Sequence, residues 1–191
     1  MRRVIVSEFV TLDGVMEDPG GVEGFERGGW AFRYERGAEG DKFKLDEVMD
    51  ADAMLLGRVT YQGFAEAWPD RTDEAGFADK MNSMPKYVVS NSLESADWNN
   101  STVIRGDVAA EIAALKQGPG GDLLVAGSGT LVDTLRRHDL VDEYRLMVFP
   151  VVLGTGKRLF ADGDMNSLRL VETQPTGEVV ILRLEPVRDD A

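Results

Sequence analysis

The sequence predicts an α/β protein with a mostly parallel central sheet. Short apolar runs alternate along the chain with segments of helical periodicity. Most of these runs are apolar on both faces, which is typical of parallel strands covered on both sides. The last two runs alternate between apolar and polar residues instead, as solvated antiparallel strands do. We therefore expect a parallel sheet that ends in antiparallel strands.

Length and composition indicate one domain. A chain of 191 residues with 43% hydrophobic residues can bury roughly 70% of its unfolded surface. The chain has no internal repeat and no low-complexity linker. The absence of cysteine excludes disulfides, thiolate nucleophiles, Cys-based zinc sites and iron–sulfur clusters. We expect a single domain over residues 1–191 and no metal site.

Charge and hydropathy exclude two classes of partner. The net charge is −13, and no window forms the basic stripe that a nucleic acid would require. The longest apolar run, Leu146 to Leu153, is interrupted by Pro150 and is far shorter than the ~18 residues of a membrane span. The apolar stretch after Met1 breaks at Ser7-Glu8, too early for a signal peptide. We expect a cytoplasmic protein that binds neither nucleic acid nor a membrane.

The first strand and the segment after it differ sharply in composition. Val4 to Val10 is rich in β-branched residues and leads to the turn pair Asp13-Gly14, which predicts a buried strand. From Glu17 to Gly40 the chain has seven glycines and scattered aromatic residues. Long loops of this kind are often lids or binding loops. We expect a partly ordered lid, with a disordered insertion as the alternative.

The remaining elements follow from apolar periodicity and from turn residues. Leu45, Val48 and Met49 share a helical face, for example, and Pro69 follows a helical pattern at its end. Helices are predicted at Asp41–Asp50, Thr60–Ala67, Ala109–Lys116 and Thr130–Arg137. Strands are predicted at Ala53–Leu56, Tyr87–Val89, Thr102–Ile104, Leu123–Ala126, Tyr144–Val152, Leu168–Glu172 and Val179–Leu184.

Three strand ends carry polar or glycine-rich turns that suit a phosphorylated nucleotide. In open parallel sheets, ligands bind outside the carboxyl ends of the strands. There, glycines let backbone amides approach phosphate oxygens, and helix N-termini favour anions. Arg58 adds a guanidinium fork for a phosphate monoester. The three turns are Gly57-Arg58-Val59-Thr60, Ser90-Asn91-Ser92 and Gly127-Ser128-Gly129-Thr130. The alternative is that each is only a turn, because none matches a complete nucleotide-binding fingerprint.

An ordered set of motifs also resembles a known family. The set comprises Val6-Ser7 through Leu12-Asp13-Gly14, Leu56 to Tyr61, Tyr87 to Ser90, Leu124 to Leu131, Leu140 to Leu146, and Pro150 to Gly156. It is similar to the dihydrofolate-reductase-like fold, most closely to the C-terminal reductase domain of the riboflavin-biosynthesis bifunctional deaminase-reductase. The resemblance covers nearly the whole chain. It implies helices on both faces of the sheet, an NADPH cofactor, and hydride transfer to a pyrimidine or pteridine ring.

The resemblance also implies roles for individual residues. Those matching the family's cofactor segments are Gly57, Arg58, Thr60, Ser90, Asn91, Gly127, Ser128, Gly129 and Thr130. Asp13 and Gly14 match the loop beside the nicotinamide and the substrate. Asp41 lies roughly where dihydrofolate reductases place a substrate-binding carboxylate, although the surrounding pattern differs. The alternative for Asp41 is an ordinary helix N-cap.

Several hypotheses stay open at this point. The leading one is a reductase resembling 5-amino-6-(5-phosphoribosylamino)uracil reductase. The alternatives are a dihydrofolate or small-carbonyl reductase, and a non-catalytic nucleotide-binding protein. Trp30 follows two glycines, so it either swings with the lid to shield the hydride path or anchors the loop on the core. The apolar faces of the two C-terminal strands predict a homodimer.

Overall fold

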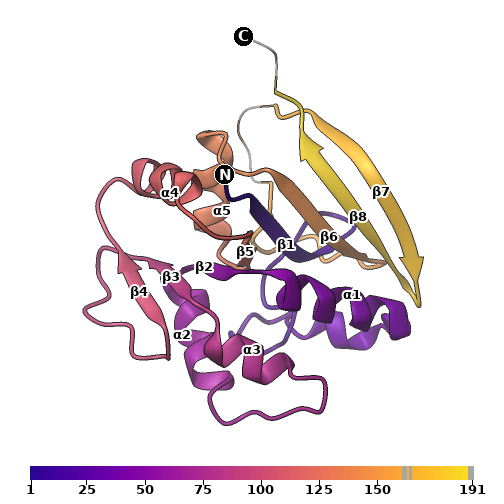
Figure 1. Ribbon diagram of the computed structural model, residues 1–191. Coiled ribbons are helices and arrows are strands. Elements are labelled where there is room, and N and C mark those ends of the chain that lie inside the picture. Colours follow the sequence, from indigo (N-terminus) through magenta and orange to yellow (C-terminus); the bar gives the residue numbers. More distant parts are fainter. Residues whose placement is uncertain (161–162, 164, 189–191) are drawn as a thin grey trace.

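The computed structural model describes residues 1–160, 163 and 165–188 of the chain. It contains one eight-stranded sheet with the order β4-β3-β2-β5-β1-β6-β8-β7. The six strands from β4 to β6 pair in parallel, and β8 and β7 continue the sheet as antiparallel strands (Figure 1). The expected α/β fold class, with its antiparallel C-terminal end, is therefore confirmed.

The elements have the following bounds. The strands are β1 Val4–Thr11, β2 Ala53–Gly57, β3 Lys86–Val89, β4 Ser101–Ile104, β5 Leu123–Ala126, β6 Glu143–Phe149, β7 Leu168–Thr176 and β8 Val179–Pro186. The helices are α1 Gly37–Asp50, α2 Arg58–Ala67, α3 Phe77–Ser83, α4 Val108–Gln117 and α5 Gly129–Arg137, with a 3₁₀ turn, η1, at Trp30–Arg33.

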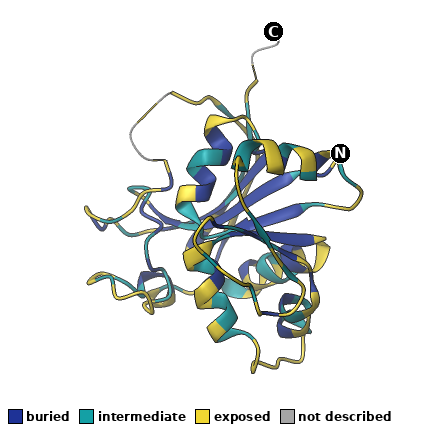
Figure 2. Ribbon diagram, turned by 90° about the vertical axis from the view of Figure 1, so that its left-hand side faces the viewer, coloured by how far each residue is buried: buried dark blue, intermediate teal, exposed yellow. Residues whose placement is uncertain are grey.

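Helices cover both faces of the sheet. α1, α2 and α3 lie on one face, and α4 and α5 lie on the other (Figure 1). Alternate residues of the central strand β1 point to these two layers, as its pleat requires. Val4, Val6 and Val10 belong to the core with α5, whereas Ile5 packs with α1. Figure 2 shows the central strands as a buried band between the two helical layers.

Helix α1 begins at Gly37, four residues before the predicted start at Asp41. The left-handed φ of +69° at Gly37 lets its backbone approach the turn between β7 and β8, where a Cβ would lie 3.1 Å from the Gly177 nitrogen. Gly40 packs in the same way, and a Cβ there would lie 3.2 Å from Thr176 Cγ2. The first turn of α1 is thus fixed by contacts with distant residues. Asp41 is not an N-cap, so that alternative is wrong.

Two further differences have local causes. Strand β6 ends at Phe149 because the next residue, Pro150, has no N–H to continue the ladder. The short helix α3 was not predicted, because its seven residues carry too little apolar periodicity. It is held at its start by Asp73, whose carboxylate accepts hydrogen bonds from the amides of Phe77 and Ala78, at 3.0 and 2.6 Å.

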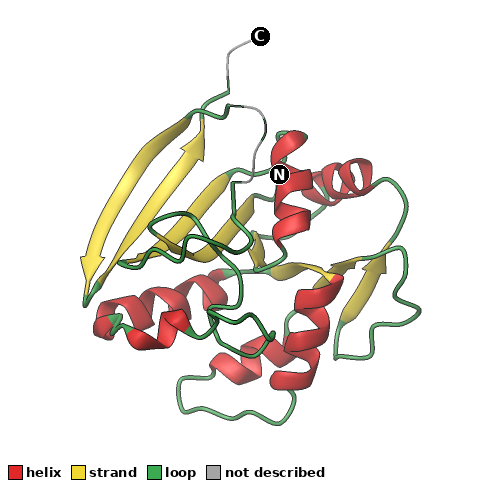
Figure 3. Cartoon of the chain, turned by 180° about the vertical axis from the view of Figure 1, so that it is seen from behind, coloured by secondary structure: helices red, strands yellow, loops and turns green. Residues whose placement is uncertain are grey.

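The segment between β1 and α1 follows an ordered path that is loop apart from the 3₁₀ turn η1 (Figure 3). The carboxylate of Asp18 organises its first part by accepting hydrogen bonds from the amides of Val22 and Glu23, at 2.7 and 3.0 Å. Arg27 donates a hydrogen bond to the Leu153 carbonyl across the molecule. Gly29 has a left-handed φ of +74° and leads into η1. A disordered insertion is therefore the wrong alternative for these residues, whereas their role as a lid stays a prediction.

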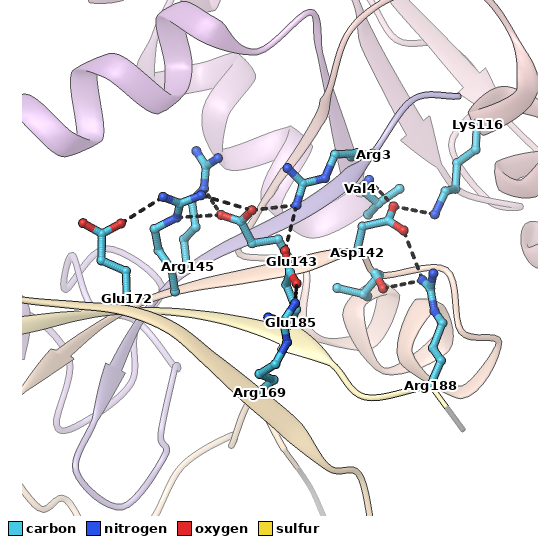
Figure 4. A network of polar contacts seen from close by, with 12 residues as sticks. Arg3, Val4, Lys116, Asp142, Glu143, Arg145, Arg169, Glu172, Glu185 and Arg188 are labelled. Atoms are coloured by element: carbon cyan, nitrogen blue, oxygen red, sulfur yellow. Dashed lines mark hydrogen bonds and ion pairs between the residues drawn. The ribbon is translucent and has the colours of Figure 1, made fainter. Parts of the chain in front are cut away.

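A charged network joins β1, β6 and β8 at the amino end of β6 (Figure 4). Glu143 accepts hydrogen bonds from Arg3, Arg145 and Arg183 at 2.7, 2.7 and 3.0 Å. These bonds lie at the end of the sheet opposite to the one at which ligands bind in open α/β sheets.

Among the helices that the structure describes, none combines the length and apolar character needed to cross a membrane.

Candidate active site

The order of the strands places a topological switch point, named here the β1–β5 crevice, between β5 and β1. These two strands are adjacent and parallel, but the helices that follow them, α5 and α1, lie on opposite faces of the sheet (Figure 1). The two chains therefore diverge at the carboxyl ends of the strands. Crevices of this kind are the usual ligand sites of open α/β sheets. The last paired residues are Ser7 and Ala126, so the crevice opens at Glu8 on one side and Gly127 on the other.

Two of the three predicted turns are bonded to each other beside this crevice. The hydroxyl of Ser128 accepts a hydrogen bond from the Gly57 amide at 2.9 Å. The hydroxyl of Thr60 in turn accepts one from the Ser128 amide, also at 2.9 Å. The ends of β2 and β5 and the starts of α2 and α5 thus form one unit. The structure brings together the segments around Gly57 and Gly127 as the sequence analysis expected. The Ser128 hydroxyl also donates to the Ala126 carbonyl at 3.2 Å, so its proton is already used within the loop.

The starts of α2 and α5 have the properties of an anion site. Neither N-cap residue, Gly57 or Ser128, makes a side-chain cap hydrogen bond. Helix α4 differs, because its N-cap Asp107 accepts a hydrogen bond from the Ala110 amide at 3.1 Å. Two uncapped helix starts place backbone amides and about +0.5 of an elementary charge each at the same edge of the sheet. Phosphate oxygens fit donors of this kind.

The backbone of the β5–α5 loop is unusually close to its surroundings. Gly127 has a φ of +59°, and a Cβ there would lie 2.9 Å from Thr60 Oγ1. A Cβ on Gly129 would lie 2.9 Å from the sulfur of Met16. Ser128 has a left-handed φ of 61°, which is uncommon for a residue other than glycine and is often found at functional sites. Thr130 is exposed in the first turn of α5.

Arg58 and the β3 turn flank this unit. Arg58 is exposed at the start of α2, and its guanidinium donates a hydrogen bond to Gln62 Oε1 at 2.9 Å. Strand β3 pairs directly with β2, so its turn lies next in line. There, Ser90 Oγ accepts a hydrogen bond from the Leu93 amide at 2.9 Å, and Asn91 Oδ1 accepts one from the Gly106 amide at 3.0 Å. Ser90 thus holds its own turn, and Asn91 joins that turn to the segment after β4.

Asp13 connects the loop after β1 to the segment after β6. Its carboxylate accepts hydrogen bonds from the Thr11 hydroxyl at 2.6 Å and from the amides of Leu153 and Gly154 at 3.2 and 2.7 Å. The Thr11 bond is the main cause that lowers the pKa of Asp13 to about 2. Gly14 takes a left-handed φ of +78° in the same turn. The structure thus gives Asp13 a part in shaping the loop, and its expected contact with substrate stays a prediction.

Asp41 and Trp30 take no part in the hydrogen-bonded unit formed by the starts of α2 and α5. Asp41 is in the second turn of α1, with its side chain 63% exposed and paired to Arg36 at 2.7 Å. It borders an open surface cavity of about 490 Å³ that Phe9 and Tyr34 also line. Trp30 is 0% exposed, and its ring meets that of Phe149 edge-on at 5.3 Å. This is the arrangement of a loop anchor, the second of the two alternatives for Trp30.

The structure also reveals a buried polar cluster that the sequence analysis did not propose as a site. Ser7 Oγ donates a hydrogen bond to Glu47 Oε1 at 2.8 Å and accepts one from Lys44 Nζ at 2.8 Å. Ser7, Glu8 and Glu47 are 3%, 5% and 4% exposed. Burial raises the pKa of the Glu8 carboxyl well above its usual value. The available signal was Ser7-Glu8 itself, since two polar residues interrupt a strand that is otherwise apolar on both faces.

Comparisons with known proteins identify the family of the chain. Residues 2–182 match the family model described as RibD C-terminal domain. Two Bacillus subtilis (strain 168) proteins, named uncharacterized protein YyaP and uncharacterized protein YwjB, are each 31% identical to the chain. The matches cover 94% of this chain and 92% of YyaP, and 95% of this chain and 96% of YwjB.

Solved structures share the fold. A putative riboflavin biosynthesis protein from Shewanella sp. PV-4 superposes with a TM-score of 0.75 at 19% identity, covering 97% of this chain and 99% of that one. RibD from Acinetobacter baumannii gives a TM-score of 0.62 at 17% identity, covering 98% of this chain. The chain spans only 59% of that longer protein. The expected resemblance is confirmed, and the chain belongs to the RibD C-terminal domain family, with a dihydrofolate-reductase-like fold.

Proposed function

We propose that this protein is an NADPH-dependent oxidoreductase that reduces a pyrimidine- or pteridine-like ring, in the manner of 5-amino-6-(5-phosphoribosylamino)uracil reductase. The observation that carries the proposal is the pair of uncapped helix starts, α2 and α5, joined through Ser128 and Thr60 beside the crevice. Membership of the RibD C-terminal domain family supports a reductase. The two Bacillus proteins are named as uncharacterized, so the reductase proposal does not rest on them.

Different residues of the chain would bind different parts of NADPH and of the substrate. The amides of residues 127–130 and the start of α2 would bind the pyrophosphate of NADPH. Arg58 would pair with the 2′-phosphate, and the turn at Ser90 and Asn91 would flank the adenosine ribose. NADPH, when bound, supplies the hydride. The protein would orient the substrate and exclude water, with Asp13, Gly14 and the segment around Trp30 shaping the substrate side.

Two further proposals concern the state of the protein in the cell. We expect a homodimer, because β7 is a long edge strand with exposed apolar residues. We expect it to act in the cytoplasm, where NADPH and small heterocyclic substrates are present. A nucleotide-binding protein without turnover is the competing function, and a dihydrofolate or small-carbonyl reductase is the competing substrate assignment.

Cofactor preference gives the first test. Only NADPH carries the 2′-phosphate, and a hydrogen bond to a charged group contributes about 1.5–3 kcal/mol, which is roughly 10- to 150-fold in affinity. Wild type should bind NADPH more tightly than NADH by this margin in a fluorescence titration, and Arg58→Ala should lose most of the preference. Arg137→Ala is the matched control, because it removes an exposed arginine from the far end of α5. Equal affinities of wild type for NADPH and NADH would contradict the assignment of Arg58.

Turnover separates the competing functions. NADPH oxidation should be measured against ribosylaminopyrimidines, pteridines including dihydrofolate, and small carbonyl compounds. We expect consumption of NADPH with the pyrimidine or pteridine compounds. Tight NADPH binding without oxidation by any of the compounds would favour the non-catalytic protein instead.

A further inference from the structure

The buried carboxylate Glu8 lies where β1 parts from β5. It is the first residue of β1 beyond the last pair that β1 forms with β5, Ser7 and Ala126. By the alternation of the strand, its side chain points to the same face as Val6 and Val10, which pack with α5. The neighbouring Ser7 points to the other face, toward α1. Glu8 therefore lies under the β5–α5 loop, beside the proposed cofactor site.

The carboxyl of Glu8 is incompletely bonded. It is 5% exposed, and its Oε1 atom is buried without a hydrogen-bond partner among the described residues. Two other buried carboxylates among the described residues are well bonded. Glu47 is bonded to Ser7 and Lys44, and Glu143 to three arginines. A buried polar atom without a partner is unfavourable, so Glu8 Oε1 is placed to bond a group that the described residues do not supply.

Charged groups of two segments act on Glu8 electrostatically. Lys44 and Glu47 belong to α1, on the other face of the sheet, and Glu23 belongs to the loop after β1. The charge of Lys44 is already shared with Glu47, which it contacts as an ion pair. Burial is the largest influence on Glu8 and disfavours its ionised form; Glu47 and Glu23 act in the same direction, whereas Lys44 and the Gly127 backbone oppose it. The environment of Glu8 therefore shifts its equilibrium toward the acid form, relative to an exposed carboxyl.

We propose that Glu8 is the proton donor of the site, delivering its carboxylic-acid proton to the nitrogen or oxygen of the substrate double bond that is reduced. This assignment rests on the proposed function. The substrate carbon of the C=N or C=O bond accepts the hydride of NADPH, which becomes NADP⁺. The π electron pair moves to the nitrogen or oxygen and forms the N–H or O–H bond with the Glu8 proton. The resulting carboxylate regains a proton from solvent.

The Glu8→Gln variant tests this assignment, because glutamine has the same shape but no acidic proton. Its kcat should fall by about 10²- to 10⁴-fold, the usual contribution of a general acid, while its affinity for NADPH stays near that of wild type. The kcat/KM of wild type should fall as pH rises through the Glu8 pKa. The kcat/KM of the variant should not show this alkaline decrease. Glu39→Gln, an exposed carboxylate of α1, is the control and should keep the wild-type rate and pH profile.

Infrared spectroscopy provides a readout that does not need turnover. Wild type with ¹³C-labelled glutamate should show the carbonyl band of a buried neutral carboxylic acid at neutral pH. The band should disappear at alkaline pH in the unmodified protein, which keeps the test valid even if Glu8→Gln folds poorly. It should also be absent from Glu8→Gln and present in Glu39→Gln. Absence of the band from wild type would overturn the inference.

The outcomes separate the two proposals. A wild type that oxidises NADPH and a Glu8→Gln variant with the same rate and pH profile would overturn the role of Glu8 and leave the proposed function standing. A wild type that binds no NADPH would overturn the proposed function and the proton donation with it, even with the infrared band present. A Glu8→Gln variant that loses turnover and the alkaline decrease of kcat/KM, but binds NADPH as wild type does, would support both proposals.

Discussion

Three carboxylate side chains take different roles in this fold according to their surroundings. Asp41 is exposed and pairs with a neighbouring arginine, Asp13 is bonded to three donors that shape a loop, and Glu8 is buried with an unbonded oxygen. The sequence predicted Asp13 and Asp41 as site residues because they match positions of a known family. It could not rank Glu8 above them, because burial and bonding arise only when β1, α1 and the β5–α5 loop come together.

The role of Trp30 also depends on burial that the sequence does not show, and this burial gives a prediction about stability. Its ring is fully buried against Phe149, and its indole N–H donates a hydrogen bond to the Glu17 carbonyl at 2.8 Å. Trp30→Ala should cost about 3–5 kcal/mol through the cavity it leaves, or roughly 6–20 °C in melting temperature for a chain of this size. A thermal melt followed by circular dichroism measures this, with the exposed Phe32→Ala as control. A near-wild-type melt of Trp30→Ala with turnover lost would favour the shielding role instead.

At the scale of the element, the sequence predicted best the strands and helices with strong local patterns. The strand Leu123–Ala126 was predicted to the residue, because its apolar run is bounded by polar residues and glycine. Elements whose bounds depend on distant contacts were predicted less well. Helix α1 begins early because Gly37 and Gly40 fit against the β7–β8 turn. The junction of α2 and α5 through Ser128 and Thr60 likewise joins residues about 70 positions apart and has no local signal.

The network at the amino end of β6 gives a prediction about pH. Burial opposes ionisation of Glu143, but the bonds from Arg183 and Arg145 outweigh it and lower its pKa to about 2 (Figure 4). A lowered pKa means that the stabilisation is fully present above the unfolded pKa of about 4.3 and is lost as pH falls toward 2. Glu143→Gln should therefore be less stable than wild type at pH 7. We expect the free energy of unfolding to fall by about 2 kcal/mol. This is less than the loss for a fully buried pair, because the arginine side chains are 16–41% exposed.

Urea unfolding of wild type and Glu143→Gln at a series of pH values measures the difference in their free energies of unfolding. This difference should shrink steadily between about pH 5 and pH 2, as Glu143 of wild type takes up its proton. Asp79→Asn, an exposed carboxylate in the first turn of α3, serves as a control for general charge effects. A difference that stayed constant over this pH range would mean that Glu143 stabilises the sheet by packing and not by its charge.

At the scale of the whole molecule, the two edges of the sheet differ. Strand β4 forms one edge and has only four residues, whereas β7 forms the other and has nine. The hairpin of β7 and β8 extends to one side of the molecule (Figure 1). It exposes Leu170, Val171 and Val180 at 55%, 44% and 37%. A long apolar edge is a site for association unless it is covered.

We expect this edge to be covered by a second copy of the chain, since a symmetric dimer is the commonest way to bury such a surface. Light scattering at micromolar concentration should give about twice the chain mass of 21.0 kDa. Val171→Lys should place a charge in the contact and shift the protein to the monomer. Val22→Lys alters a residue that is 88% exposed outside the hairpin and should leave the dimer intact. A wild type of single-chain mass would show that β7 stays open to solvent, and a dimer unaffected by Val171→Lys would place the contact on another surface.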